Sequence, residues 1–313
     1  MVRVVFFGNS ASGFTARHFE ALLATPAELV GLVDVPPSQR STTNPRQDGH
    51  NSIAGEARRR DIPLFEPQRT DEGGFVVDIQ SLEPDLFVAA GYALLLRAPL
   101  LALPSLMAVN FHASLLPDYR GKHPIFWALR NGERWVGLSV HVMDRGIDTG
   151  DLIYQVKIQT RQDDSVASLY ERIMERSVPL VERLILDAAL GTISRIPQPE
   201  GSGSYYSSTT EEDFRLVWNW PAGLIRRYIT VTPGKCYLQM GEGRLYIIDA
   251  KVDSDSTAHL PGTILRINRS RTIVAARDGE VSLGMVRDIN GQVQSASAYF
   301  RNRGLTPGAM LTG

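Results

Sequence analysis

The sequence predicts an α/β domain with a doubly wound, mostly parallel sheet, followed by a smaller β-barrel domain. Apolar runs such as Val2–Gly8 and Asp85–Ala90 are continuous rather than alternating, as expected for strands that helices cover on both faces. Segments with helical periodicity separate these runs, which favours a three-layer arrangement. From Cys236 onward, short strand-like segments separated by glycines indicate the barrel.

The elements expected before residue 197 alternate as this fold requires. The first strand ends at Gly8, and a turn leads into a helix. This turn lacks the middle glycine of G-x-G-x-x-G, which argues against a dinucleotide site. The expected strands are Val2–Gly8, Glu28–Val35, Pro63–Phe65, Asp85–Ala90, Met107–Phe111, Gly137–Met143 and Leu152–Ile158. The expected helices are Phe14–Ala24, Ser52–Arg60, Phe75–Leu82, Ile125–Asn131 and Ser165–Leu190.

The composition changes at Pro197–Ser208, which reads PQPEGSGSYYSS and is typical of a linker. We therefore expect a catalytic domain over residues 1–196, a linker over 197–210 and a C-terminal β-barrel domain over 211–313. The barrel domain is expected to hold a helix at Phe214–Tyr228 and strands at Cys236–Met240, Arg244–Ala250, Gly262–Ile267, Thr272–Ala276 and Glu280–Leu283.

Composition and charge describe an ordinary globular protein. The 313 residues are 43% apolar and 21% charged, and 33 basic against 34 acidic residues give a net charge of −1. This balance lacks the basic excess of a nucleic-acid-binding surface. No apolar run approaches the roughly 20 residues that span a bilayer. With a single cysteine and no signal-peptide pattern, we expect a cytoplasmic protein without disulfides or a cysteine-based metal site.

Three polar residues around the strand Met107–Phe111 form the candidate reaction centre. Asn110 and His112 lie two positions apart, so strand alternation puts both side chains on one side of the sheet. An amide can donate to a developing oxyanion, and an imidazole can give or take a proton near neutral pH. Asp148 follows in a glycine-containing loop that could return its carboxylate to the imidazole.

The string N-x-H-x-S-L-L-P-x-Y-R-G-x-x-P, followed by I-D-T-G-D, closely resembles the formyltransferases that use 10-formyltetrahydrofolate. That family includes enzymes acting on methionyl-tRNA, amino sugars and glycinamide ribonucleotide. The resemblance covers nearly the whole chain and implies the formyltransferase fold followed by an OB-like β-barrel. It also implies that Asn110, His112 and Asp148 are the catalytic residues, with 10-formyltetrahydrofolate as co-substrate and no metal.

The resemblance further implies two sets of binding residues. The residues expected to bind the folate are Gly91, Tyr92, Ala93, Leu94, Ser114, Leu115, Leu116, Pro117, Asp144, Gly146 and Ile147. The residues expected to contact the acceptor are Ser10, Arg120, His123 and Trp127, although His123 is also consistent with an ordinary surface histidine. His18, His50, His141 and His259 have no partner that the sequence reveals, and no role is expected for them.

Three departures from the tRNA-acting members concern the acceptor. The loop Val35–Ser52 lacks their cluster of lysines and arginines, and the linker Ser204–Arg215 has three acidic residues against one arginine. Trp127 also replaces a polar residue that is usual in those enzymes. We therefore expect a small-molecule amine, such as an amino sugar or an amino-acid-like building block, as the acceptor.

Three alternatives remain open from the sequence. A methionyl-tRNA formyltransferase that has lost some positive charge would keep the tRNA as acceptor. A formyltetrahydrofolate hydrolase would share the three catalytic residues but release formate, although the C-terminal domain and the long loop disfavour it. A non-catalytic binding protein would need one of the three residues to be replaced, and all are present. The oligomeric state has no sequence signal.

Overall fold

The computed structural model describes residues 1–40, 42, 45, 52–241 and 243–311. Contacts divide the chain into two compact units, each treated separately below. The first comprises Met1–Trp127, Arg134–Thr160 and Ala167–Ser207, and the second comprises Ala128–Glu133, Arg161–Val166 and Ser208–Gly313. Because these units are defined by contacts and do not follow chain order, the boundaries expected at residues 196 and 210 stay predictions.

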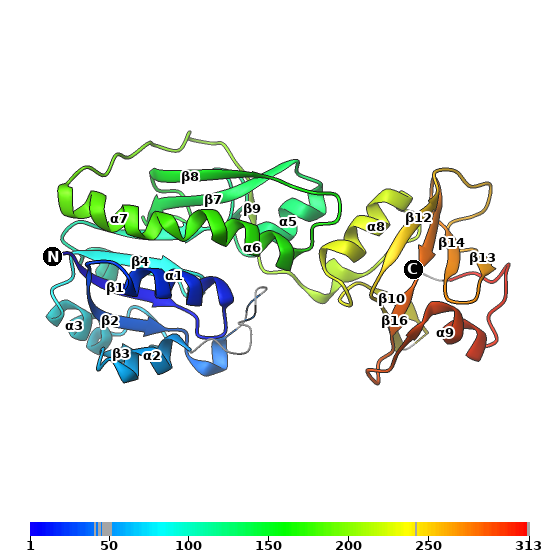
Figure 1. The fold of residues 1–313 in the computed structure, drawn as a ribbon, viewed down its shortest axis with the longest axis horizontal. Helices are drawn as coiled ribbons and strands as arrows, with labels where there is room; N and C mark the ends of the chain where they lie inside the picture. The colour runs from blue at the N-terminus through cyan, green and yellow to red at the C-terminus, as the bar shows by residue number, and fades with distance from the viewer. Residues whose placement is uncertain (41, 43–44, 46–51, 242, 312–313) are drawn as a thin grey trace. The chain divides into compact units, whose positions relative to one another are not determined.

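The first unit is built on a seven-stranded sheet with strand order β3-β2-β1-β4-β5-β7-β8 (Figure 1). All pairs from β3 to β5 are parallel, whereas β7 runs antiparallel to both β5 and β8. The strands are β1 (Arg3–Gly8), β2 (Glu28–Asp34), β3 (Leu64–Phe65), β4 (Leu86–Ala90), β5 (Met107–His112), β7 (Trp135–Val142) and β8 (Leu152–Gln159). The expected mostly parallel sheet is thus confirmed.

Alternate residues of β1 face opposite layers of helices, as a doubly wound sheet requires. Phe6 contacts Phe19 of the helix α1 with ring centroids 5.2 Å apart. Phe7 instead belongs to a buried cluster that includes Phe75 and Ile79 of the helix α3. The helices before residue 191 are α1 (Gly13–Leu23), α2 (Ile53–Arg59), α3 (Gly73–Ser81), α4 (Ala98–Leu101), α5 (Pro124–Asn131), α6 (Val166–Ser177) and α7 (Pro179–Leu190), with a 3-10 turn at Pro37–Gln39.

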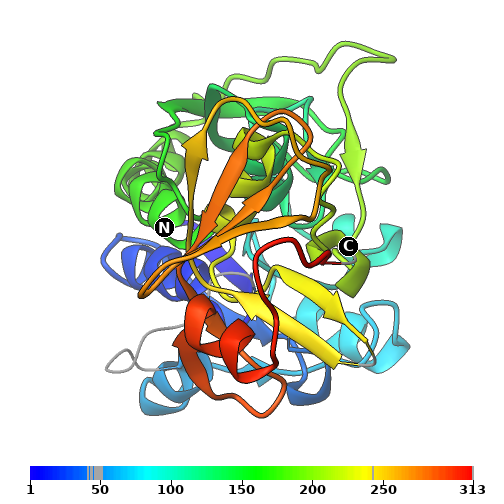
Figure 2. The same cartoon turned by 90° about the vertical axis from the view of Figure 1, so that its right-hand side faces the viewer.

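The second unit is rich in strands, as expected. Figure 2 shows the strands of this unit. One four-stranded sheet has the order β10 (Tyr237–Met240), β11 (Gly243–Ile247), β16 (Met285–Arg287) and β17 (Val293–Ser295). A second four-stranded sheet has the order β12 (Ala250–Ser254), β15 (Glu280–Leu283), β14 (Thr272–Ala275) and β13 (Ile264–Ile267). The remaining elements are a 3-10 turn at Glu211–Phe214 and the helices α8 (Ala222–Val231) and α9 (Ala296–Asn302). Leu238, Ile264 and Phe300 are fully buried in its core.

Three sequence expectations were wrong, and proline explains two of them. The segment expected as one helix at Ser165–Leu190 is two helices, because Pro179 lacks the backbone N–H that a continuous helix needs. The helix expected at Phe214–Tyr228 begins at Ala222, directly after Pro221. The strand expected at Arg244–Ala250 ends at Ile247, and Ala250 starts the next strand in the other sheet.

Two further expectations concern the long loop after β2 and membrane-spanning helices. Half of the loop expected at Val35–Ser52, including Arg46, lies outside the described residues. Among the helices that the structure describes, none is long and apolar enough to cross a membrane.

His18 is a fully buried titratable group that joins α1 to α6. Its Nδ1 donates to the Phe14 carbonyl at 2.7 Å, so the neutral ring accepts the Ser177 hydroxyl at Nε2, 3.0 Å away. The ring packs between Phe14 and Phe111 with centroid distances of 4.2 and 5.0 Å. Burial lowers the pKa of His18 to about 4. The side chain is therefore a neutral part of the core.

We expect this histidine to make the fold sensitive to mild acid. The pKa of His18 is lower in the folded protein than in the unfolded chain, so its contribution to the free energy of unfolding is fully present above pH 6.5. That free energy falls by roughly 3 kcal/mol as the pH decreases to 4. In the variant His18→Gln, which cannot ionise there, this part of the pH dependence should disappear. Urea unfolding of both proteins between pH 7 and pH 4 measures the difference. Parallel stability curves for the two proteins would contradict the prediction.

Candidate active site

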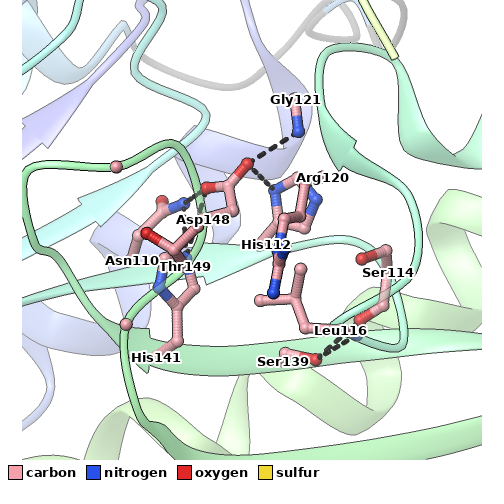
Figure 3. A network of polar contacts seen from close by, with 12 residues as sticks. Asn110, His112, Ser114, Leu116, Arg120, Gly121, Ser139, His141, Asp148 and Thr149 are labelled. Carbon is pink, nitrogen blue, oxygen red and sulfur yellow. Dashed lines mark hydrogen bonds and ion pairs between the residues drawn. The ribbon is translucent and has the colours of Figure 1, made fainter. Parts of the chain in front are cut away.

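The strand β5 brings Asn110 and His112 to the same side of the sheet. In the antiparallel pairing with β7, Asn110 lies opposite His141 and His112 lies opposite Ser139. Figure 3 shows that Asn110, His112 and His141 surround the carboxylate of Asp148. The expected placement of Asn110 and His112 on one side is consistent with their shared contacts to this carboxylate.

Asp148 reaches the site from the loop between β7 and β8. Its Oδ2 accepts the Gly121 backbone N–H at 2.8 Å and lies 3.6 Å from His112 Nδ1. Its Oδ1 lies 3.3 Å from His141 Nε2 and accepts the Asn110 amide at 3.4 Å. These contacts come from β5, β6 (Arg120–Gly121) and β7, so one carboxylate connects three elements that are distant in sequence.

The loop that carries Asp148 has a tight backbone. Asp148 itself has a φ of 54°, in the left-handed region that L residues seldom adopt. A Cβ added at Gly150 would lie 2.1 Å from the Val142 carbonyl oxygen. The I-D-T-G-D sequence therefore needs glycine at this position, because the loop returns directly onto β7.

Asp148 is held in its ionised form. Burial alone would raise the pKa of its carboxyl, but the charge of His112, the contact with His141 and the Gly121 N–H oppose burial and lower the pKa to well below its ordinary value. The side chain is only 12% exposed. The site thus contains a shielded carboxylate that stays negatively charged at neutral and mildly acidic pH.

Both ring nitrogens of His112 have neighbours. The Tyr119 carbonyl can only accept, so the Nε2 at 2.8 Å carries a proton. Nδ1 faces Asp148, which places it where a proton can pass between the two groups. A substrate oxygen near Nε2 would compete with the Tyr119 carbonyl for its proton.

His141 also contacts the Asp148 carboxylate, although the sequence predicted no role for it. Its Nδ1 donates to the Val142 carbonyl at 2.9 Å, and its Nε2 lies 3.3 Å from Asn110 Nδ2 as well as from Asp148. The ring is buried, with 2% exposure. Its strand was expected, but only the register of β7 against β5 brings it opposite Asn110.

The turn after β4 carries the first group of residues expected to bind folate. Gly91 has a φ of 71°, and a Cβ there would lie 2.8 Å from the Thr15 hydroxyl. Tyr92 packs edge-on against Phe7 at 5.4 Å, and its hydroxyl is buried without a partner among the described residues. Burial, and then the charge of Asp34, raises the pKa of Tyr92. Ala93 is exposed and Leu94 is half-buried.

The turn after β5 holds the second expected group, Ser114 to Pro117. The Ser139 hydroxyl donates to the Ser114 carbonyl at 2.8 Å and accepts the Leu116 N–H at 3.1 Å. Gln155 donates to the Leu116 carbonyl at 3.0 Å. Leu116 is buried, whereas Leu115 and Pro117 are half-buried. Ser139 and Gln155 were missed in the sequence because they act from β7 and β8.

The third expected group lies in the same loop as Asp148. Asp144 Oδ1 accepts the Gly146 N–H at 2.9 Å and the Thr149 hydroxyl at 2.7 Å, which closes the loop on itself. Ile147 is 44% exposed, a high value for a large apolar side chain. Residues that bind folate in this loop would therefore be presented on a fixed turn.

The four residues expected to contact the acceptor lie at three places: after β1, in β6 and around the start of α5. Ser10, at the end of β1, bonds to the buried Asp34 through both its N–H and its hydroxyl. The Arg120 guanidinium donates to Gln198 and to the Ser202 carbonyl. His123 precedes α5 with a φ of 55°. Trp127 stacks on Tyr206 at 4.9 Å. Their roles in acceptor binding stay predictions.

No metal-binding group of three or more His, Cys, Asp and Glu side chains occurs within residues 1–40, 42, 45, 52–241 and 243–311. The site contains the amide of Asn110, the imidazole of His112 and the carboxylate of Asp148 in contact with one another. Such a group can polarise a carbonyl oxygen and move a proton, which are the needs of acyl-group transfer.

Comparison with known proteins agrees with this chemistry. Residues 2–184 match the formyl transferase family, and residues 209–304 match the formyl transferase C-terminal domain. A methionyl-tRNA formyltransferase of Pseudomonas putida (strain GB-1) is 30% identical over 304 residues, covering 96% of each chain. The enzyme of the same name from Staphylococcus aureus (strain Newman) is 29% identical over 282 residues, covering 90% of this chain and 89% of the relative.

A solved structure shows the same fold. The N-formyltransferase from Helicobacter canadensis, in complex with folinic acid and dTDP-3-aminofucose, superposes with a TM-score of 0.65 at 16% identity, covering 91% of this chain and 99% of the other. The fold and site thus define an enzyme of the group-transfer class. The chain belongs to the formyl transferase family. The membership expected from the sequence, and with it an enzyme that transfers a formyl group, is confirmed.

We expect Asn110, His112 and Asp148 to act as one unit. Replacing any of them with alanine should lower kcat by about 100-fold or more, because each contributes to one hydrogen-bonded group. Double replacements should cost much less than the product of the single effects. Steady-state formyl transfer by the three single and three double variants measures this.

The matched control is Asp151→Asn, which removes a carboxylate from the same loop at a position outside the contact network. It should keep kcat within about twofold. Turnover of His112→Ala at the rate of the unmodified protein would refute the assigned mechanism.

Proposed function

We propose that this enzyme transfers the formyl group of 10-formyltetrahydrofolate to the primary amine of a small molecule. The observation that carries the proposal is the cluster of Asn110, His112 and ionised Asp148 at the end of β5. The folinic acid bound by the Helicobacter canadensis relative supports a folate as the donor.

The chemistry that this cluster can supply follows from the reaction. An amine that attacks a formamide passes through a tetrahedral intermediate with a negatively charged oxygen. The Asn110 amide and a protonated His112 would donate to that oxygen, and loss of one such donor typically costs on the order of 3 kcal/mol. The new C–N bond then remains while the bond to the folate nitrogen breaks.

The proton of the attacking amine must also move. Only a neutral amine can attack, and its nitrogen gains a positive charge when the new bond forms. Ionised Asp148 can attract that charge and take up the proton transiently. The same proton then serves the departing folate nitrogen, so no net proton is consumed.

The folate is proposed to bind between Gly91–Leu94 and Asp144–Asp148. Both segments follow strands of the same sheet, and Gly91 lets the chain turn sharply beside Thr15 with a φ of 71°. The exposed Ile147 offers an apolar surface for that ring.

We expect 10-formyltetrahydrofolate, or a stable analogue, to slow hydrogen exchange in both of these segments. Bound ligand would shield their amides from solvent and restrict local opening. Exchange followed by mass spectrometry with and without ligand measures the protection, and α3 serves as the internal reference. Protection confined to residues beyond 208 would contradict the proposed binding site.

The acceptor is proposed to be small because Arg40, one of the two arginines of the loop expected at Val35–Ser52, is already paired. Arg40 lies 2.6 Å from Asp34 and 2.7 Å from Glu66, and its Nε donates to the Val35 carbonyl. Arg40 is thus bound within the protein at the base of the loop that would meet an acceptor. A polyanion such as tRNA needs many free basic groups.

The acidic residues after the linker support the same proposal. Glu211 pairs with Arg244 at 2.8 Å, and Asp213 pairs with Arg130 at 3.1 Å. Within residues 197–207 the charged side chain is Glu200. A segment with this charge would not attract a phosphate backbone.

A methionyl-tRNA acceptor is the second candidate. Its support is the similarity over nearly full length to the Pseudomonas putida enzyme, which includes the C-terminal domain. The aminofucose nucleotide bound by the Helicobacter canadensis relative favours a small amine instead.

A direct competition of acceptors tests the choice. Purified enzyme with 10-formyltetrahydrofolate should formylate members of a panel of amino sugars, nucleotide amino sugars and amino acids, and should act weakly on methionyl initiator tRNA. Free formate, measured in the same reactions, separates transfer from hydrolysis. Efficient tRNA formylation that falls steeply between 50 and 200 mM salt, the behaviour expected of phosphate contacts, would overturn the small-molecule proposal.

A further inference from the structure

The segment 196–207, which overlaps the linker-like stretch Pro197–Ser208, contacts the loops of the candidate active site at both of its ends. It begins at an isolated pairing of Ile196 with Leu152, beside the end of the Asp148 loop. It ends with β9 (Tyr205–Tyr206), which pairs in parallel with β6 (Arg120–Gly121). A linker that only joins two domains would not need hydrogen bonds at both of these places.

Gln198 is the residue of this segment that reaches the Asp148 loop. Its Nε2 donates to the Asp148 carbonyl at 2.9 Å and to the Gly150 carbonyl at 2.7 Å. Its Oε1 accepts the Arg120 guanidinium at 2.7 Å. Residues 194–197 and 199–201 are exposed, whereas Gln198 is half-buried. One side-chain amide therefore joins the loop of Asp148 to the loop of Arg120.

The rest of the segment fixes the Arg120 loop. Ser204 accepts the Tyr119 N–H through its hydroxyl at 2.9 Å and the Arg120 N–H through its carbonyl at 2.9 Å. The Tyr206 ring lies between Tyr119, stacked at 5.2 Å, and Trp127, stacked at 4.9 Å. These contacts hold the backbone of residues 119–121 in place.

The two joined loops supply partners to the reacting groups. The Tyr119 carbonyl accepts from His112 Nε2, and the Gly121 N–H donates to Asp148 Oδ2. Asp148 must also keep the left-handed φ of 54° that aims its side chain at the histidines. The hydrogen bond from Gln198 to the Asp148 carbonyl holds the backbone of that same residue.

We propose that Gln198 is a positioning residue for Asp148, and that the linker thereby forms part of the active site. This inference rests on the proposed function for its effect on turnover. Gln198 touches neither the substrate nor the reacting atoms in the proposal. It holds Asp148 where Gly121 can donate to it, so removing the amide should free the carboxylate to turn away.

Two variants separate the donated from the accepted bonds of Gln198. Gln198→Glu keeps the side-chain length and the acceptor for Arg120, but it cannot donate to the two carbonyls. Gln198→Ala removes all three bonds. The matched control is Glu200→Ala, an exposed residue two positions along the same segment. Because Gln198 is only half-buried, all three proteins should fold, which circular dichroism and thermal melting can verify.

The first readout is the exchange rate of the Gly121 amide proton, measured by NMR in the free protein. This amide donates to Asp148, so we expect it to exchange at least about tenfold faster in both Gln198 variants. The second readout is steady-state kinetics with a responsive acceptor. We expect kcat to fall about tenfold or more in both variants, while the KM for the folate donor changes less than about threefold.

Each outcome decides the proposal. If Gln198→Glu behaves like the unmodified protein, the donated bonds are unimportant and the proposal is wrong. Faster Gly121 exchange without a loss of kcat also overturns it, because the contact would then be structural only. If the unmodified protein transfers formyl to no amine, the proposed function fails, and Gly121 exchange alone supports or overturns the positioning role.

Discussion

A negatively charged carboxylate shielded from water is the constraint on which the candidate active site depends. An isolated charge in such a place is costly, so Asp148 requires several donors at once. The Asn110 amide and the Gly121 backbone N–H donate to it, and the imidazoles of His112 and His141 lie 3.6 and 3.3 Å away. The antiparallel pairing of β7 with β5 matters for this reason, because it brings His141 opposite Asn110.

Much of this arrangement could be predicted from the sequence because the responsible signals are local. The buried strands show as continuous apolar runs, and Ser12 and Ser52 cap the helices that follow them. Asn110 and His112 lie on one short strand, and the glycines around Asp148 indicate a tight turn. Pro179 and Pro221 were also local signals, and giving them full weight would have divided the first expected helix and placed the start of the second correctly.

The contributions of His141 and Gln198 could not be predicted in this way. His141 is a polar residue in a mostly apolar strand. Its contact with Asp148 depends on the register of β7 against β5, which the sequence of β7 alone does not determine. Gln198 stands in a segment with the composition of a flexible linker. Its contacts depend on two loops that lie 78 and 50 residues earlier in the chain. Tertiary context, rather than local propensity, determines both.

The parallel pairing of β9 with β6 changes where this enzyme can be divided. The family similarities leave a gap between residues 184 and 209, and the chain's composition changes within that gap. In the structure, however, residues 198–206 complete the surroundings of Asp148. A gene fusion or an exchange of C-terminal domains between relatives would therefore preserve the reaction centre only when the junction follows Ser207. Recombination at residue 196 would combine the Asp148 and Arg120 loops of one parent with the contacting segment 198–206 of the other.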